Sequence, residues 1–214
     1  MPRKPRLFVS GATYHVYSRV ARGEFAFHDP YEAEEFVETV RHVGDLHNWR
    51  VLAWCLMGNH YHLVVKTGTI PLWRSMQRLQ SIVAREFNRR RRYLGRLWQS
   101  RYRARIIDSN DYLRQVVSYV HLNPVAACIV EDPVDYRYSG HRELMGFCKP
   151  LVVDRCATLA ISRYGYRVCD VADLIFKHRS SITLWFNKGL FTENTNPDFA
   201  LRLNQLDEQI SRMR

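Results

Sequence analysis

Two short apolar runs joined by a tight turn constrain the fold more than any other feature of this 214-residue sequence. Residues 51–57 and 60–65 are rich in strand formers, and a glycine and an asparagine lie between them, so the segment predicts a β-hairpin. The second strand begins with His60 and His62, which point to one face because side chains alternate along a strand. Two such imidazoles can share a divalent metal ion with a third ligand from elsewhere, although packed or solvated histidines are the commoner case.

Strand and helix patterns alternate on both sides of this hairpin. The predicted elements are strands at 13–20 and 97–107 and helices at about 30–48 and 70–93. This order predicts an α+β fold of the ferredoxin-like type, a four-stranded antiparallel sheet with two helices on one face. His15 lies in the first strand, where packing or a hydrogen bond within the sheet is the expected role.

A further helix is predicted over about 110–123. Tyr119 and Asn123 are one turn apart in it and therefore share a face. Pro124 is expected to end or kink the helix, because the residue before a proline is biased away from helical angles.

The chain carries a net charge of +11, and the charge is localised. Residues 67–105 hold eleven arginines and one acidic residue, Glu86, a net of +10. Arginine can grip phosphate through two hydrogen bonds, so nucleic acid is the predicted partner. The alternative is a solvated basic face that only aids solubility.

Aromatic rings interleave with arginines in the predicted strand 97–107. Trp98 and Tyr102 would suit unpaired nucleic acid, whose bases stack on aromatic side chains; the alternative is that both rings are core. The candidate nucleic-acid-binding residues are Arg74, Arg78, Arg85, Arg89, Arg90, Arg91, Arg92, Trp98, Arg101, Arg103 and Arg105.

The cysteines and the apolar segments of the sequence indicate the cellular compartment. The five cysteines are scattered without a paired motif, so disulfides and a cysteine zinc site are not expected. The N-terminus has no apolar segment typical of a signal peptide, and no apolar run reaches the length of a membrane span. A cytoplasmic, chromosome-associated protein is predicted, and both monomer and homodimer remain open.

Residues 150–214 differ in pattern from the rest and predict a small helical C-terminal domain. Two of its short helices, joined by a tight turn at 177–179, resemble a helix-turn-helix that would bind DNA. The alternative is a helical cap packed on the first domain.

Three motifs in order, Met57–His62, Leu97–Tyr102 and Ser118–Val125, resemble those of the single-tyrosine transposases of the HUH superfamily. Within them the chain is most similar to the REP-associated tyrosine transposases, domesticated bacterial relatives of a minimal insertion-sequence transposase. The similarity covers roughly residues 8–145, which places the transposase domain at 1–149.

The resemblance implies a nickase and strand transferase that acts on single-stranded DNA hairpins from repeat elements and uses Mg²⁺ or Mn²⁺. It assigns His60, His62 and Asn123 as metal ligands and Tyr119 as the nucleophile. The first strand departs from the family pattern, because Arg19 is followed by valine instead of glycine. The alternative equivalent of that pattern is the later Arg22-Gly23, and no role is assigned to the region.

The chemistry of these side chains agrees with such roles. A tyrosine hydroxyl titrates near pH 10 and is a weak nucleophile at neutrality, so a metal ion that offsets the phosphate charge would be needed. Attack by Tyr119 would form a 5′-phosphotyrosine and conserve the phosphoester, so that rejoining needs no ATP. Two alternatives remain: a repeat-DNA-binding protein with little or no cleavage, and a metal-dependent phosphodiesterase that uses water.

Overall fold

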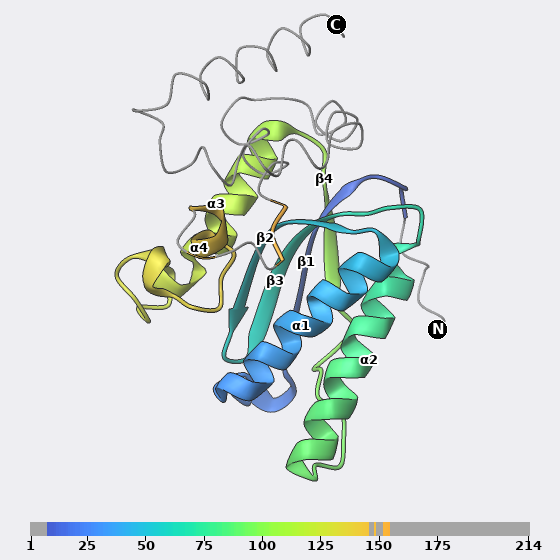
Figure 1. Cartoon of the computed structure of the whole chain (residues 1–214), viewed down its shortest axis with the longest axis vertical. Helices are drawn as coiled ribbons and strands as arrows, with labels where there is room; N and C mark the ends of the chain where they lie inside the picture. The colour runs from blue at the N-terminus through green and yellow to red at the C-terminus, as the bar shows by residue number, and fades with distance from the viewer. Residues whose placement is uncertain (1–7, 146–147, 149–151, 155–214) are drawn as a thin grey trace, which may run out of the picture.

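The computed structural model describes residues 8–145, 148 and 152–154 of the chain, and it confirms the predicted α+β fold (Figure 1). One antiparallel sheet has the strand order β2-β3-β1-β4, which is the ferredoxin-like order. The elements are β1 (Thr13–Arg19), a 3₁₀ turn (Ala21–Gly23), α1 (Pro30–His47), β2 (Arg50–Met57), β3 (His60–Lys66), α2 (Leu72–Arg91), β4 (Arg103–Ile107), α3 (Asn110–Ala126), a second 3₁₀ turn (Pro133–Asp135) and α4 (His141–Leu144).

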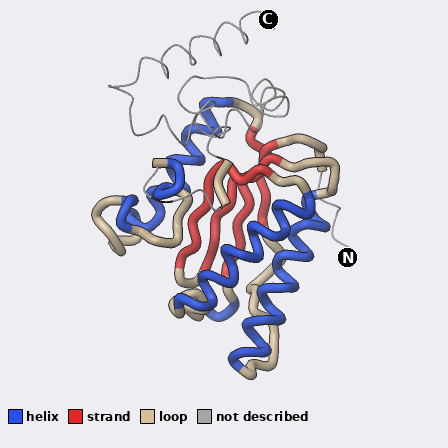
Figure 2. Tube along the Cα trace, viewed as in Figure 1, coloured by secondary structure: helices blue, strands red, loops and turns tan. Residues whose placement is uncertain are grey.

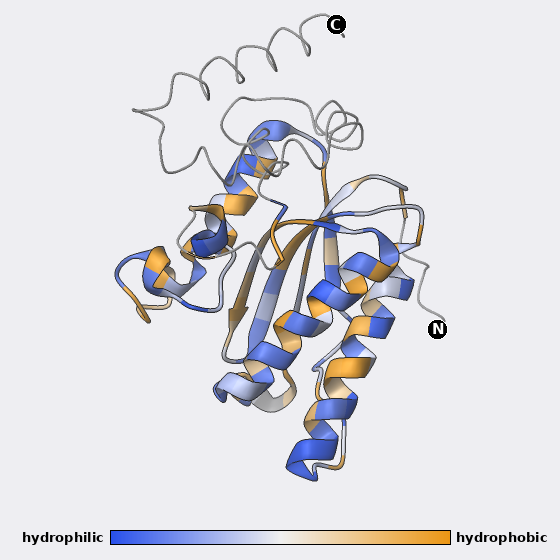
Figure 3. Ribbon diagram, viewed as in Figure 1, coloured by the Kyte–Doolittle hydropathy of each residue, from blue (hydrophilic) through white to orange (hydrophobic). Residues whose placement is uncertain are grey.

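Helices α1 and α2 cover one face of the sheet (Figures 1 and 2). Orange and blue residues alternate along both helices in Figure 3, as expected of amphipathic helices. The core between helices and sheet includes Tyr14 and Val16 of β1, Leu63 of β3, Phe36 of α1 and Met76 of α2. Since side chains alternate along a strand, the residues between these core positions in β1 and β3 face the other side of the sheet.

The ends of α1 follow the pattern predicted from the sequence. The carboxylate of Asp29 accepts a hydrogen bond of 2.9 Å from the backbone N–H of Tyr31, and Pro30 occupies the first helical position. The helix closes at Asn48, which adopts left-handed backbone angles with a φ of 52°.

Helix α3 is longer than predicted: it runs through Pro124 and ends at Ala126. A proline has no N–H to donate to the carbonyl four residues earlier, so Pro124 costs α3 one hydrogen bond. Only two residues of α3 follow Pro124, so little of the helix lies beyond this gap. The last turn is closed by hydrogen bonds from Ala127 to the Asn123 carbonyl and from Ile129 to the Pro124 carbonyl. Asn123 therefore keeps a helical position one turn after Tyr119.

The predicted strand 97–107 is also shorter than expected. Only Arg103–Ile107 forms β4, and the residues before it cross the end of β1, where Trp98 forms an isolated bridge with Val20 and Gln99 donates to the Arg19 carbonyl. This crossing brings residues 99–101 next to the last residues of β1.

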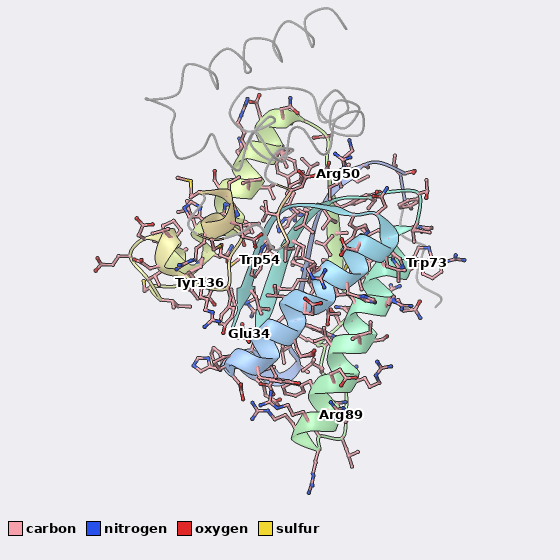
Figure 4. All side chains as sticks on the ribbon, in the orientation of Figure 1. Glu34, Arg50, Trp54, Trp73, Arg89 and Tyr136 are labelled. Carbon is pink, nitrogen blue, oxygen red and sulfur yellow. The ribbon has the colours of Figure 1, made fainter. Side chains whose placement is uncertain are left out.

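The chain after α3 returns along β2, the edge strand. The carboxylate of Glu143, which is 3% exposed, accepts hydrogen bonds from the indole of Trp54 at 2.9 Å and from the backbone N–H groups of Val152 and Val153 at 2.8 and 2.9 Å. Trp54 and Tyr136 lie on this side of the molecule in Figure 4. Glu143 thus joins residues 152–153 to the sheet.

The predicted helical domain over 150–214, with its helix-turn-helix, lies outside the described residues apart from 152–154. Within the described part of the chain, no helix has both the length and the apolar character needed to cross a membrane.

Candidate active site

The four residues predicted to form the site come together on the face of the sheet opposite α1 and α2. His60 and His62 project from β3, with ring centroids 5.3 Å apart, and Tyr119 and Asn123 project from α3. The ring of Tyr119 lies edge-on to His62 at a centroid distance of 5.4 Å. Two distant parts of the sequence thus meet at one place, as the three motifs predicted.

His62 forms a buried contact with a second histidine. Its Nδ1 lies 2.9 Å from Nε2 of His15, on the neighbouring strand β1. Burial, followed by the nearby His15, His60 and Arg19 side chains, lowers the pKa of His62 to about 3. Burial, followed by the guanidinium of Arg105, lowers the pKa of His15 to about 4. Both rings are therefore neutral at physiological pH, which is the state that binds metal.

His60 is held by two amide side chains. Its Nδ1 lies 2.8 Å from Oδ1 of Asn59, and Asn123 also forms a side-chain hydrogen bond with it. Burial lowers the pKa of His60, the guanidinium of Arg19 lowers it further, and the bond with Asn123 partly opposes that lowering. His60 is thus also set to be neutral, and it lies beside the proposed third ligand.

Tyr119 is accessible, with 53% of its surface exposed. The amide of Asn123 donates a hydrogen bond of 2.9 Å to the backbone carbonyl of Tyr119, which ties the two residues together along α3. The Tyr119 side chain also lies edge-on to His15 at 6.0 Å between centroids. The hydroxyl can therefore meet a substrate from solvent while its ring rests against the histidine pair.

These side chains line an open cleft of about 560 Å³. Three guanidinium groups, those of Arg19, Arg101 and Arg103, line it, and no acidic side chain does so among the described residues. The full lining is Tyr17, Ser18, Arg19, Met57, His60, His62, Gln99, Ser100, Arg101, Arg103, Tyr119, Asn123, Ala126 and Ala127. A cleft with cations and neutral imidazoles suits an anionic phosphodiester.

The donor set fits a divalent metal ion with open coordination positions. No group of three or more His, Cys, Asp or Glu suited to a metal occurs among the described residues, so the candidate set consists of two imidazoles, His60 and His62, and the amide of Asn123. Nδ1 of each histidine is engaged in one of the contacts described above, so Nε2 is the candidate ligating nitrogen of both rings. Three protein ligands leave room for water and phosphate oxygen.

The structure divides the predicted nucleic-acid-binding arginines between the two faces of the sheet. Arg101 and Arg103 line the cleft, and Arg105 pairs with His15 in the β1–β4 ladder and so lies on the same face. The arginines of α2 lie on the opposite side, because α2 packs on the other face of the sheet (Figure 1; Arg89 is labelled in Figure 4). These are Arg74, Arg78, Arg85, Arg89, Arg90 and Arg91, with Arg92 at the end of the helix.

Two of the α2 arginines have a structural role that the sequence did not reveal. Arg90 and Arg91 form ion pairs with Asp29 and with Glu32, which is buried, at the start of α1. A buried carboxylate needs such partners because its charge is otherwise costly to desolvate. The clustering of arginines in sequence therefore does not correspond to one DNA-binding surface.

The structure favours the alternative interpretation of Trp98, in which the ring packs with the core. Its indole N–H donates to the Gln80 carbonyl at 2.9 Å, and its ring packs edge-on against Tyr61 at 5.5 Å, on the core side of the sheet. Tyr102 is likewise buried in the core. Tyr102 is buried and Trp98 is half-buried against the core, so the alternative interpretation describes the position of both rings, and base stacking by Trp98 stays a prediction.

Sequence reasoning missed Arg19 and underestimated His15. Both lie in β1 with Tyr17 between them, at a spacing of two that puts all three on one face. The ladder pairs Arg19 with His60 and Tyr17 with His62, so this face is the face of the site. The alternation was visible in the sequence, but the adjacency of β1 and β3 was needed to interpret it.

Comparisons with known proteins give one matching family model and two similar solved structures among those found. A family model described as "Transposase IS200 like" matches residues 8–123. A solved structure of "the REP associates tyrosine transposase bound to a REP hairpin" has a similar fold, with a TM-score of 0.57 and 19% identity over 71% of this chain and 90% of that chain. A transposase structure from Deinococcus radiodurans R1 aligns over 56% of this chain and 95% of its own, at 17% identity and a TM-score of 0.40.

A search of curated protein sequences gives no match. The family model, by contrast, spans more than half of the chain and includes the histidine pair, Tyr119 and Asn123. On that match, the chain belongs to the family of IS200-like transposases.

Proposed function

We propose that this transposase cleaves and rejoins single-stranded DNA folded as repeat-element hairpins, through a covalent 5′-phosphotyrosine at Tyr119. The observation that carries the proposal is the position of Tyr119: exposed, against the ring of His62, one turn from Asn123 and inside an arginine-lined cleft. A repeat-DNA-binding protein would have no need for this combination. The hairpin substrate is proposed by analogy with the structural neighbour, which was solved bound to a REP hairpin.

In the proposed reaction the phenolic oxygen of Tyr119 attacks the scissile phosphorus. The P–O3′ bond breaks, the 5′ phosphate stays on the tyrosine, and the released strand ends in a 3′-hydroxyl, which takes up a proton equivalent to the one that the tyrosine loses. A second 3′-hydroxyl reverses the step and restores the phosphodiester. The guanidinium groups of Arg19, Arg101 and Arg103 bind the DNA backbone in the cleft.

His60, His62 and Asn123 are the proposed ligands of Mg²⁺ or Mn²⁺. Bound there, the ion would withdraw charge from the scissile phosphate, which makes attack by a weak phenol nucleophile feasible. The neutral state of both histidines and the amide oxygen of Asn123 support this assignment, because all three can donate lone pairs.

The test is a covalent-adduct assay. The full chain is incubated with end-labelled single-stranded hairpin DNA and Mg²⁺ or Mn²⁺ and is then run on a denaturing gel. We expect a protein–DNA band that disappears when a chelator removes the metal. Cleavage without this band would overturn the tyrosine mechanism in favour of water as nucleophile, and binding with neither product, over a panel of hairpins, would leave a DNA-binding protein.

Arginines on the two faces of the sheet are expected to differ in their effect on DNA binding. The double variant Arg101→Ala/Arg103→Ala should weaken binding of single-stranded DNA and flatten the salt dependence, with the log–log slope falling by about 0.7 for each phosphate that the protein no longer neutralises. The matched control is Arg85→Ala/Arg89→Ala on α2, where both side chains are exposed and pair only with Glu86 among the described residues.

Fluorescence anisotropy at several salt concentrations measures both slopes. An equal decrease of the slope in the two double variants would show that α2 contacts the same strand, contrary to its place behind the sheet.

A further inference from the structure

The buried contact between His15 and His62 couples the tautomers of the two rings. Nδ1 of His62 lies 2.9 Å from Nε2 of His15, and the two side chains are only 6% and 7% exposed. Two neutral imidazole nitrogens at this distance must share one hydrogen, so one ring donates and the other accepts. The choice of donor decides which nitrogen of His62 keeps its lone pair.

His60 provides a comparison for the tautomer of His62. Its Nδ1 faces Oδ1 of Asn59 at 2.8 Å, and a carbonyl oxygen can only accept, so the hydrogen of His60 resides on Nδ1 and Nε2 keeps the lone pair. If His62 has the same tautomer, both histidines offer Nε2 as the ligating nitrogen. The opposite arrangement, with His15 donating, would put the hydrogen of His62 on Nε2 and remove it as a ligand.

We propose that His15 is a positioning residue for the metal centre: its Nε2 accepts the hydrogen bond from Nδ1 of His62 and so keeps the Nε2 lone pair of His62 available to the ion. This inference rests on the proposed function, since it gives His62 the role of a metal ligand. His15 itself touches no reacting atom and acts through His62.

The surroundings hold His15 in this position. It is two residues along β1 from the direct partner of His62, which is Tyr17, and the ring centroids of His15 and His62 are 5.2 Å apart with 26° between the ring planes. Diagonal neighbours on adjacent strands are within reach of each other when the side chains are aromatic. The same ring meets Tyr119 edge-on at 6.0 Å, so His15 contacts both a proposed ligand and the proposed nucleophile.

The experiment uses the full chain with ¹⁵N-labelled histidine. Long-range ¹H–¹⁵N spectra show which ring nitrogen of His62 carries hydrogen, with no metal or DNA present. Binding of Mn²⁺ alone is then measured by water-proton relaxation. The variants are His15→Leu, which removes the acceptor, and His15→Gln, whose amide oxygen can take the place of Nε2. Tyr14→Phe, the adjacent residue on the core side of β1, is the control for general damage to the strand.

In the wild-type protein we expect hydrogen on Nδ1 of His62. His15→Leu should lose this tautomer and bind Mn²⁺ roughly 10- to 100-fold more weakly, the usual cost of removing a partner of a metal-bound histidine. His15→Gln should recover most of the affinity, and Tyr14→Phe should leave tautomer and affinity unchanged.

Hydrogen on Nε2 of His62 in the wild-type protein would overturn the inference, as would unchanged Mn²⁺ affinity in folded His15→Leu. A different set of results would contradict the proposed function alone. If the wild-type protein has the expected tautomer and binds Mn²⁺ through His15-dependent His62 but forms no covalent adduct, the positioning role stands and the tyrosine mechanism falls.

Discussion

Replacement of Tyr119 by phenylalanine is expected to abolish formation of the covalent protein–DNA adduct and to reduce cleavage by at least roughly 10³-fold, since loss of a nucleophile removes the reaction path itself. The exposed ring makes few packing interactions that depend on its hydroxyl, so the fold should be retained. DNA affinity should change less than twofold, because the arginines of the cleft remain. The measurements are adduct yield on a denaturing gel, single-turnover cleavage, and hairpin affinity by anisotropy.

Tyr112→Phe is the matched control for this experiment. Tyr112 lies on the same helix, about two turns before Tyr119, and is absent from the lining of the cleft. Its variant should form the adduct at the wild-type rate. A persistent adduct in Tyr119→Phe, or an equal loss in both variants, would contradict the assignment of Tyr119 as the nucleophile.

Glu143→Ala is expected to lower the free energy of unfolding by about 3 kcal/mol. The buried carboxylate accepts hydrogen bonds from the indole of Trp54 and from the backbone N–H groups of Val152 and Val153 in the described part of the chain. Its removal leaves two buried donors, the indole of Trp54 and the N–H of Val153, and the half-buried N–H of Val152 without this acceptor, and each unsatisfied buried donor costs about 1–3 kcal/mol. Urea denaturation followed by circular dichroism measures the change.

Glu34→Ala provides the comparison. Glu34 also carries a carboxylate, but its ion pair with Arg137 lies on the surface, with both side chains more than half exposed. Exposed pairs contribute at most about 1 kcal/mol, so the midpoint of unfolding should barely move. A loss at Glu143 no greater than that at Glu34 would show that residues 152–153 contribute little to the stability of the sheet.

Much of the fold was predictable because its signals are local. The turn at Gly58-Asn59 between two apolar runs, and the Asp-Pro start of α1, depend on residues close together in the chain. Alternation put His60 and His62 on one face, and helical spacing did the same for Tyr119 and Asn123. The element order, the fold class and the two halves of the candidate site could therefore be predicted from the amino-acid sequence.

The way in which these elements face one another could not be predicted from such local signals. The strand order puts β1 beside β3, which turns His15 into the partner of His62 and brings Arg19 into the cleft. Packing of α2 on the other face of the sheet separates its arginines from Tyr119. Trp98 packs against the core although it lies between basic residues in the sequence. The periodicity of a sequence specifies one face of each helix or strand. Which faces pack together is determined by burial of apolar surface, and this depends on residues far apart in the chain.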